Sequence, residues 1–446
     1  MTPPRTTGFI NWMLPLMVIF AAIDVLLSGR DLSQSYMELA GLTAASRHPI
    51  MPWVQRAFSL ALLLISLYRI ATHFANRRPV PSMLLLAVFV AYWVGTVATT
   101  ALLGAHRDVS HEYAYALVIG VACLLVTTQE IGAIADTARN TLFAIMLLSV
   151  GLVPVWPTLV LDASYMQGLL PGVPRLGGVA PHPVALGMFA QTALLLLWAR
   201  PFRIRWINVL AWVLGLSVLF FAQSKTAWIA FLLCATAMLA VRHGPSAWRR
   251  LGDPREGAFG IVACLTVILV AGALLALLLL TDVGGEVSDF LQTPQGAQLM
   301  TLTGRDQIWA VTWEVWREFR WFGYGPGLFD DEFRLAIGMP SATHGHNQFM
   351  DTLARSGTVG ALALVVYAAV LLVLSFKYAR RSGGLSLALF LALALRSVSE
   401  VPLMLFGYGT ELFLHLLLVV TLSAAASMKV PAARTARARP VYGVPA

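Results

Sequence analysis

GTVGALALVVYAAVLLVLSF, the segment Gly357–Phe376, contains no charged residue over its whole length. An α-helix needs about 20 apolar residues to cross the ~30 Å hydrocarbon core of a bilayer, so this segment has the length and composition of a transmembrane helix. Similar runs recur along the 446-residue chain, in which 58% of residues are hydrophobic and 12% are charged. A soluble domain usually carries about twice that share of charge. The sequence therefore predicts an all-α polytopic membrane protein.

The apolar runs predict about twelve transmembrane helices. They lie near residues 9–28, 53–72, 82–103, 112–130, 141–161, 183–199, 206–222, 226–241, 258–281, 357–376, 385–402 and 409–428. Arg5 before the first run is a feature of signal peptides, but no clear small-residue cleavage site follows, so we interpret this run as a helix. The three cysteines, Cys123, Cys234 and Cys264, fall inside predicted spans and indicate no disulfide framework.

The placement of lysine and arginine predicts the orientation of these helices, because cytoplasmic loops carry an excess of both residues. With the N-terminus in the cytoplasm, most of the 31 basic residues fall on the cytoplasmic side, including the tail from Lys429 to Arg439. We therefore expect both termini to be cytoplasmic. The net charge of +9 then reflects membrane topology, and no nucleic-acid partner is expected.

One connection, residues 282–356, is far longer than the others and is expected on the outer side of the membrane. A loop of this length in a compact protein is usually functional or disordered, and this one has too many aromatic residues and too much periodicity for a disordered tether. We divide the chain into transmembrane helices 1–9 (1–281), the helical outer loop (282–356), transmembrane helices 10–12 (357–428) and a basic tail (429–446).

The outer loop contains a predicted amphipathic helix. Trp309, Trp313 and Trp316 are spaced at i, i+4 and i+7, Thr303 is a candidate N-cap, and the glycines of 323–327 end the run. Indole rings favour the membrane interface, so one interpretation is a helix lying on the bilayer surface. The alternative is a platform on which sugars stack.

Two cationic residues are candidates for binding a phosphate. Arg305 stands at the predicted start of the tryptophan helix, where free backbone N–H groups already favour an anion and a guanidinium adds charge. Lys225 lies in a very short outer turn, at the height of lipid phosphates. The ordinary alternatives are a solvated arginine and a lysine that reaches toward water at a helix end.

His346 is the candidate acid–base residue, because imidazole titrates near neutral pH. It is expected to begin a second loop helix that ends at Gly357. His344, two residues earlier, raises the alternative of a metal site. No H-E-x-x-H spacing or cysteine set accompanies the pair, and Asp330 and Asp331 are the only obvious acidic complement, so no metal is expected.

Several other ionisable residues fall within or between predicted spans. The i, i+4 spacing predicts that Arg396 pairs with Glu400 and that Glu411 pairs with His415. Such pairing within the bundle is the simpler explanation of intramembrane charge, although these residues also mark functional sites. Arg175 and His182 lie in an outer loop, on the same predicted side as His346.

Two segments resemble the O-antigen ligase and O-antigen polymerase superfamily. HNQFMDTLARSGTVG, from His346 to Gly360, is similar to its histidine motif of His, then Asn/Ser/Gln, nine residues, Gly, two residues, and Gly/Thr/Tyr. The segment GRDQIWAVTWEVWREFRWFGYGPG places Arg305 where the family has an arginine. The twelve predicted spans and the single long loop agree with the same family.

The resemblance implies a C-type glycosyltransferase architecture with a large helical periplasmic loop in the bacterial inner membrane. It implies transfer of a glycan from undecaprenyl pyrophosphate to lipid A–core oligosaccharide, with inversion and without a metal or another cofactor. By position, His346 is similar to the catalytic histidine and Arg305 to the arginine that engages pyrophosphate. Candidate substrate-binding residues are Lys225, Asn347, His344, Arg175 and His182.

The resemblance leaves three alternatives open. An O-antigen polymerase uses a second lipid-linked glycan as acceptor, and a protein O-oligosaccharyltransferase uses a protein. A transporter or flippase of lipid-linked glycan is the alternative outside the enzymes. Such transporters often consist of matching halves, and no internal duplication is visible in this sequence.

Overall fold

The computed structural model describes residues 8–32, 48–163, 172–251, 305–340 and 342–428. The predicted span near 258–281, Cys264, Thr303 and the basic tail lie outside these residues. The described elements are η1 (Phe9–Trp12), α1 (Met13–Ser28), α3 (Met51–Ala75), α4 (Met83–Trp93), η2 (Val94–Ala98), α5 (Thr99–Leu103), α6 (Tyr113–Leu124), α7 (Ile131–Gly151), α8 (Pro157–Val160), β1 (Leu161–Asp162), β2 (Arg175–Leu176), α9 (Pro183–Ala199), α10 (Arg205–Phe221), α11 (Lys225–Leu251), α15 (Arg305–Glu318), α16 (Asp331–Ala336), α17 (Gln348–Lys377), α18 (Leu385–Ser399) and α19 (Thr410–Ala426).

The fold is almost entirely helical, as the sequence predicts. Among the described residues, six helices are long and apolar enough to cross a membrane: Phe9–Ser28, Met51–Ala75, Met83–Leu103, Ile131–Gly151, Lys225–Ala247 and Gln348–Lys377. Five further apolar helices are shorter: Tyr113–Leu124, Pro183–Ala199, Arg205–Phe221, Leu385–Ser399 and Thr410–Ala426. The all-α membrane class is therefore confirmed, and the full set of twelve spans stays a prediction.

The helix predicted near 141–161 is displaced toward the N-terminus, where α7 runs from Ile131 to Gly151. Polar residues such as Arg139 made the first half of this helix look like a loop. The structure buries Arg139, whose guanidinium donates to the backbone carbonyl of Arg200, so its charge is accommodated within the bundle. At the other end, Pro154 and the turns around it stop the helix although the sequence remains apolar.

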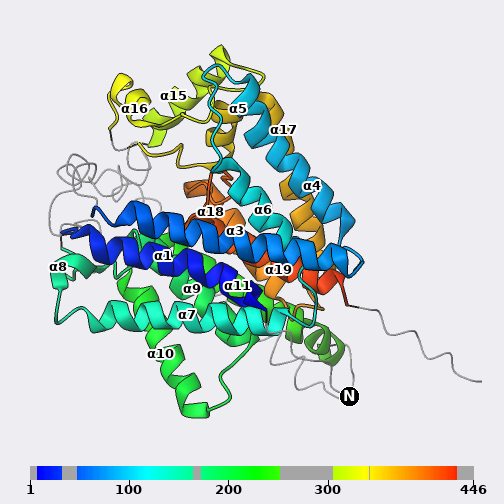
Figure 1. Cartoon of the computed structure of the whole chain (residues 1–446). Helices are drawn as coiled ribbons and strands as arrows, with labels where there is room; N and C mark the ends of the chain where they lie inside the picture. The colour runs from blue at the N-terminus through cyan, green and yellow to red at the C-terminus, as the bar shows by residue number, and fades with distance from the viewer. Residues whose placement is uncertain (1–7, 33–47, 164–171, 252–304, 341, 429–446) are drawn as a thin grey trace, which may run out of the picture.

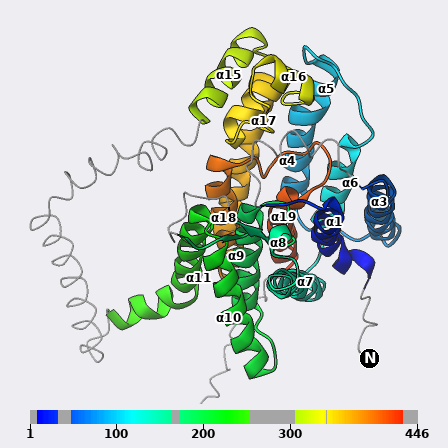
Figure 2. The same cartoon turned by 90° about the vertical axis from the view of Figure 1, so that its left-hand side faces the viewer.

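Helices α9 and α19 form the centre of the bundle. Nearly all of their residues are buried in a single apolar core. Other helices surround these two on nearly every side, whereas α3 and α10 expose large apolar side chains, as expected next to lipid. Figure 2 shows α19 between α18 and α1, and both of these helices pack against it.

Helices α15 and α16 and the first turns of α17 form a separate cap beside α5 at one end of the molecule (Figure 1). The cap has a small core of its own, made of Leu328, Phe329, Phe333, Ala342 and Ala354. Asp330 caps α16, since its carboxylate accepts the N–H of Phe333 at 2.8 Å. The cap therefore folds around its own apolar residues, and this core includes Ala342, in the segment that leads into α17.

The cap is joined to α17 by closely packed backbone. Gly357 has φ +65° and ψ −165°, so the helical geometry of α17 is interrupted there, where the sequence predicts a helix end. A Cβ atom on Gly357 would lie 2.4 Å from the carbonyl of Trp321, and only glycine fits at this contact. The N–H of Thr358 donates to the carbonyl of Arg320 at 2.7 Å. This kink fixes the first turns of α17 against the cap.

Candidate active site

The site is built on residues 344–347, which we call the histidine loop and which lead directly into α17. Asn347 is the N-cap of α17, and its side-chain oxygen accepts the N–H groups of Phe349 and Met350 at 3.0 and 3.1 Å. Asparagine is among the preferred N-caps, and α17 starts at Gln348, two residues after the start that was predicted near His346. His346 has φ +45°, an uncommon value for a residue other than glycine, and the loop around it must hold this conformation.

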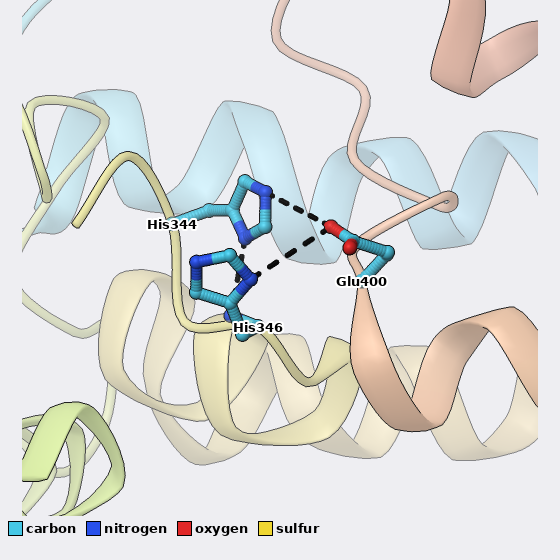
Figure 3. Close-up of side chains that lie close together, drawn as sticks. All are labelled: His344, His346 and Glu400. Atoms are coloured by element: carbon cyan, nitrogen blue, oxygen red, sulfur yellow. Dashed lines mark hydrogen bonds and ion pairs between the residues drawn. The ribbon is translucent and has the colours of Figure 1, made fainter. Parts of the chain in front are cut away.

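Glu400, the residue after α18, brings its carboxylate to both histidines of the loop (Figure 3). Its Oε2 lies 3.2 Å from Nε2 of His344 and 3.9 Å from Nδ1 of His346. The two imidazole centroids are 4.2 Å apart. The prediction that Glu400 pairs with Arg396 is wrong, because the chain leaves the helix at Glu400 and turns its side chain toward the histidines.

The hydrogen bonds of His344 determine which nitrogen carries its proton. The N–H of His346 donates to Nδ1 of His344 at 3.1 Å, so Nδ1 is an acceptor. In the neutral ring, the proton is then on Nε2 and points to the Glu400 carboxylate.

Two histidines and one glutamate are ligands that zinc accepts, and here their donor atoms lie within 4.8 Å of one another. A metal-bound nitrogen must be unprotonated, whereas the nitrogen of His344 that faces Glu400 is the protonated one. The arrangement therefore fits a hydrogen-bonded carboxylate–imidazole cluster better than a metal site. The absence of a metal from the reaction stays a prediction.

His346 is held as a neutral imidazole. Its pKa is lowered from 6.5 to about 4, mainly by burial and also by the nearby His344 and Arg305, while the carboxylates of Glu400 and Asp351 oppose the shift. A neutral imidazole at physiological pH is able to accept a proton. The loop thus provides the chemical form that a general base requires.

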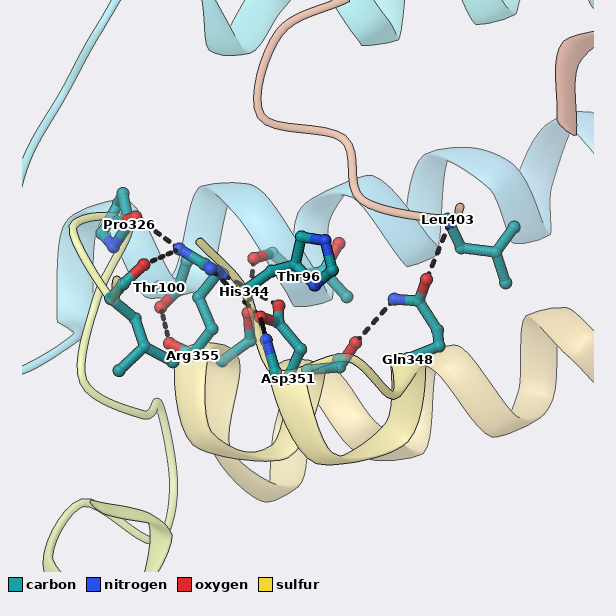
Figure 4. Close-up of polar contacts among 12 residues, drawn as sticks. Thr96, Thr100, Pro326, His344, Gln348, Asp351, Arg355 and Leu403 are labelled. Carbon is teal, nitrogen blue, oxygen red and sulfur yellow. Dashed lines mark hydrogen bonds and ion pairs between the residues drawn. The ribbon is translucent and has the colours of Figure 1, made fainter. Parts of the chain in front are cut away.

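A buried ion pair supports the histidine loop from below (Figure 4). Asp351 accepts the N–H of Gly345 at 3.0 Å and pairs with Arg355, whose Nε lies 3.0 Å away. Arg355 also donates to the carbonyls of Pro326 and Leu328 at 2.7 and 2.8 Å, in the segment that leads to α16. These contacts tie loop, cap and α17 together. The i, i+4 spacing of Asp351 and Arg355 is the sequence signal for this pair.

Arg305 is the first residue of α15 and is half-buried. One turn later, the indole N–H of Trp309 donates to the carbonyl of Gly345 at 3.0 Å, so α15 is attached to the histidine loop. Trp316 donates to Oγ1 of Thr358 at 3.2 Å. Two of the three tryptophans therefore tie α15 to the histidine loop and to α17 through their N–H groups, and the interpretation of the helix as lying on the bilayer stays a prediction.

A second group of predicted residues lies around the turn between α10 and α11. Nε of the buried Arg175 donates to the carbonyl of Ala222 at 2.7 Å, just before Lys225 begins α11. Ser224 and Thr226, on either side of Lys225, line a small pocket that is also lined by Glu400. The half-buried Lys225 therefore begins a helix whose first residues share a pocket with the carboxylate of the histidine cluster.

His182 caps α9, where its Nδ1 accepts the N–H of Val184 at 3.2 Å. Burial and Arg175 lower its pKa to about 4, whereas Glu400 opposes this shift. The loop before His182 is held by Arg30, which donates to the carbonyls of Gly178 and Ala180 at 2.6 and 2.9 Å. Arg30 follows a helix that ends in Gly29, and nothing in its sequence context indicated this long-range role.

The remaining ionisable residues form pairs other than the predicted ones. Nε of Arg396 donates to the carboxylate of Glu411 at 2.9 Å. His415, which was predicted to pair with Glu411, instead contacts the hydroxyl of Tyr367 through Nε2 at 2.6 Å. Both predictions assumed contact between neighbours on one helix, whereas the buried side chains find partners on adjacent helices.

The comparison with known families agrees with the motif. The family model described as O-antigen ligase matches residues 210–365, which include Lys225, Arg305 and the whole histidine loop. The resemblance to the O-antigen ligase family is thereby confirmed over this segment, and it supports a membrane enzyme of the ligase and polymerase type. None of the curated proteins compared with the chain matches it.

Proposed function

We propose that this chain is an O-antigen ligase that transfers a glycan from undecaprenyl pyrophosphate to the lipid A–core oligosaccharide. The observation that carries the proposal is the histidine loop. It holds a neutral His346 between the carboxylate of Glu400 and the helix that begins at Arg305, within the segment matched by the family. A proton acceptor and a cation that lie near each other suit attack by a hydroxyl and departure of a pyrophosphate.

In the proposed reaction, Nε2 of His346 takes the proton of the acceptor hydroxyl. The acceptor oxygen forms a bond to the anomeric carbon from the face opposite the leaving group, and the bond from that carbon to the pyrophosphate oxygen breaks. The undecaprenyl pyrophosphate leaves with the electron pair, so its negative charge grows while His346 becomes positive. A general base of this kind typically contributes 10²–10⁴-fold to the rate.

Arg305 and Lys225 are assigned to the pyrophosphate, because preorganised cations stabilise charge that develops in the transition state. Arg175, His182, His344 and Asn347 are assigned to the substrate-binding surroundings. The bilayer holds both lipid-anchored reactants in two dimensions, which lowers the cost of orienting them. The proposed location is the periplasmic face of the bacterial inner membrane, with both termini in the cytoplasm and residues 282–356 as the periplasmic loop.

The proposal is tested by replacing the chromosomal gene with a version that encodes His346→Ala. Lipopolysaccharide is then separated on a gel, and the glycan on undecaprenyl pyrophosphate is measured in the same cells. We expect bare lipid A–core together with long lipid-linked glycan. The matched control is His111→Ala, which removes an exposed histidine from another loop and is expected to leave the ladder intact.

The gel, an analysis of protein glycosylation and an assay of the purified chain together distinguish the alternatives. Core that carries a single repeat would indicate a polymerase, and an unmodified protein acceptor beside normal lipopolysaccharide would indicate a protein O-oligosaccharyltransferase. Glycan-linked product formed by the purified chain in detergent would exclude transport as its sole activity. An unchanged ladder in the His346→Ala strain would contradict the assignment of His346 as the base.

A further inference from the structure

Two contacts attach the histidine loop to the end of α18. Nδ2 of Asn347 donates to the carbonyl of Val398 at 3.3 Å, and Glu400 lies against the rings of His344 and His346. The side chain of Glu400 is only 17% exposed. A buried carboxylate is costly without cations or hydrogen-bond donors beside it. The charge of Arg396 favours the ionised form of Glu400 without a direct ion-pair contact, so among the described residues the hydrogen-bond donors in reach of the carboxylate are the ring nitrogens of the two histidines.

His344 satisfies part of this requirement, since its Nε2 proton points to Oε2 of Glu400. His346 is the second residue that is able to donate a hydrogen bond to this carboxylate. Its Nδ1 is buried without a hydrogen-bond partner and lies 3.9 Å from the same oxygen. A closure of roughly 1 Å would bring this pair to hydrogen-bond distance. Hydrogen bonds at catalytic histidines are often long without substrate and tighten when it binds.

The orientation of the His346 ring determines what such a bond would do. With a proton on Nδ1 directed at Glu400, the unprotonated nitrogen is Nε2, and Figure 3 shows this second nitrogen pointing away from Glu400. The opposite tautomer would leave two lone pairs facing each other across 3.9 Å. Electrostatics therefore favours the tautomer with its basic nitrogen directed away from the carboxylate.

We propose that Glu400 is a positioning residue that fixes His346 as the Nδ1–H tautomer and stabilises the imidazolium formed during transfer. This inference rests on the proposed function, in which His346 is the base. Glu400 would not touch the transferred sugar but would act through the ring. His344 would hold Glu400 in place by donating its own Nε2 proton.

Charged groups from four segments face His346. These are His344 in the same loop, Glu400 after α18, Arg305 on α15 and Asp351 on α17. Asp351 is already engaged by Arg355 and by the N–H of Gly345, and Arg305 is itself a cation. Glu400 is therefore the anion in reach of His346 that is best placed to balance a positive ring.

The proposal is tested with the full chain, purified in detergent, carrying Glu400→Gln. Lipid-linked glycan and lipid A–core, extracted from cells that lack the chain, are the substrates. We expect kcat to fall about 10- to 100-fold, a part of the 10²–10⁴-fold contribution of a general base, with KM for the donor within about twofold of wild type. In ¹⁵N spectra of labelled histidine, His346 should change from one tautomer to a mixture.

Glu400→Asp keeps the charge on a side chain shorter by one carbon–carbon bond, roughly 1.5 Å, and should give an intermediate kcat with the original tautomer still dominant. If Glu400→Gln does not accumulate in cells, Glu400→Asp decides by the same two measurements. The matched control is Glu314→Gln, which breaks an exposed ion pair on α15 and should change neither quantity.

Three results would overturn the inference. These are a normal kcat in Glu400→Gln, a reduced kcat with an unchanged His346 tautomer, and loss of wild-type activity to a chelator with recovery on adding zinc. The second result would show a purely structural role, and the third would make the cluster a metal site. Activity in His346→Ala would instead contradict the proposed function itself, so the two failures are distinguishable.

Discussion

Replacing Asp351 with asparagine removes a buried negative charge from the junction of the histidine loop, the cap and α17. Asp351 and Arg355 are 2% and 5% exposed. Both carboxylate oxygens are engaged by the guanidinium, at 3.0 and 3.2 Å, and one of them also accepts the N–H of Gly345. In the Asp351→Asn variant, an amide NH₂ would face the guanidinium donors, and the positive charge would lose its counterion.

Breaking a buried ion pair by removing one partner costs about 3–5 kcal/mol. The carbonyls of Pro326 and Leu328 still accept from Arg355, so we expect the lower end, about 3 kcal/mol in the free energy of unfolding. At roughly 2 °C per kcal/mol for a large domain, the midpoint of thermal unfolding should fall by roughly 6 °C. The loss of support at Gly345 should also lower kcat, because small displacements of a catalytic group are costly.

The assay is thermal unfolding of the purified chain in detergent, followed by tryptophan fluorescence at one scan rate. Glu314→Gln, which breaks an ion pair with both side chains mostly exposed, serves as the control and should change the midpoint little. The double variant Asp351→Asn/Arg355→Gln removes both charges and should be more stable than Asp351→Asn alone. An Asp351→Asn variant with the stability of the control would refute the reasoning.

Three further predictions concern the pH dependence, the pyrophosphate site and the kink. Because the pKa of His346 is lowered to about 4, its neutral form persists as the pH falls through 6.5, so kcat/KM should be unchanged at pH 5.5 and decline only near pH 4; a half-loss at pH 6.5 would contradict this. Lys225→Ala should lower kcat/KM for the donor by roughly 10- to 100-fold, the effect of about 1.4–2.7 kcal/mol of lost transition-state stabilisation, and Lys225→Arg should retain activity. Wild-type activity in both variants would show that Lys225 does not bind the pyrophosphate. Gly357→Ala should lower stability by more than about 1 kcal/mol, since its positive φ and the Trp321 carbonyl leave no room for Cβ, whereas Gly151→Ala, with nothing within 4 Å, should be close to neutral in the same unfolding assay.

The sequence was most informative where a local pattern decides the outcome. Uninterrupted apolar runs placed α1, α9, α10 and α19 within a few residues of their observed bounds, because polar or turn-forming residues flank each run. The helix predicted from near His346 to Gly357 corresponds to the first turns of α17, which the structure caps with Asn347 and interrupts at Gly357, where φ is positive. These features require no knowledge of distant parts of the chain.

Such local patterns do not predict contacts between residues that are far apart in the sequence. Glu400 and His346 are far apart in sequence, and the spacing of Arg396 and Glu400 suggested a local pair that the structure replaces by two long-range ones. Arg139 misled the placement of α7 because its partner, the carbonyl of Arg200, belongs to a different segment. Buried polar groups must find partners, but sequence spacing does not say which element supplies them.

The central position of α19 has a consequence for how the protein is made. Among the described helices, α19 is the last to be synthesised, yet it lies within the core that α1, α6 and α18 surround. The 227 residues that follow Ala199, up to Ala426, take roughly 11–45 s to synthesise at 5–20 residues per second. Throughout that time the helices made earlier have no completed centre to pack against. Glu400 emerges only shortly before α19, so a nascent chain has the histidine loop before it has the carboxylate that the loop contacts, and the site is incomplete until Glu400 has been added.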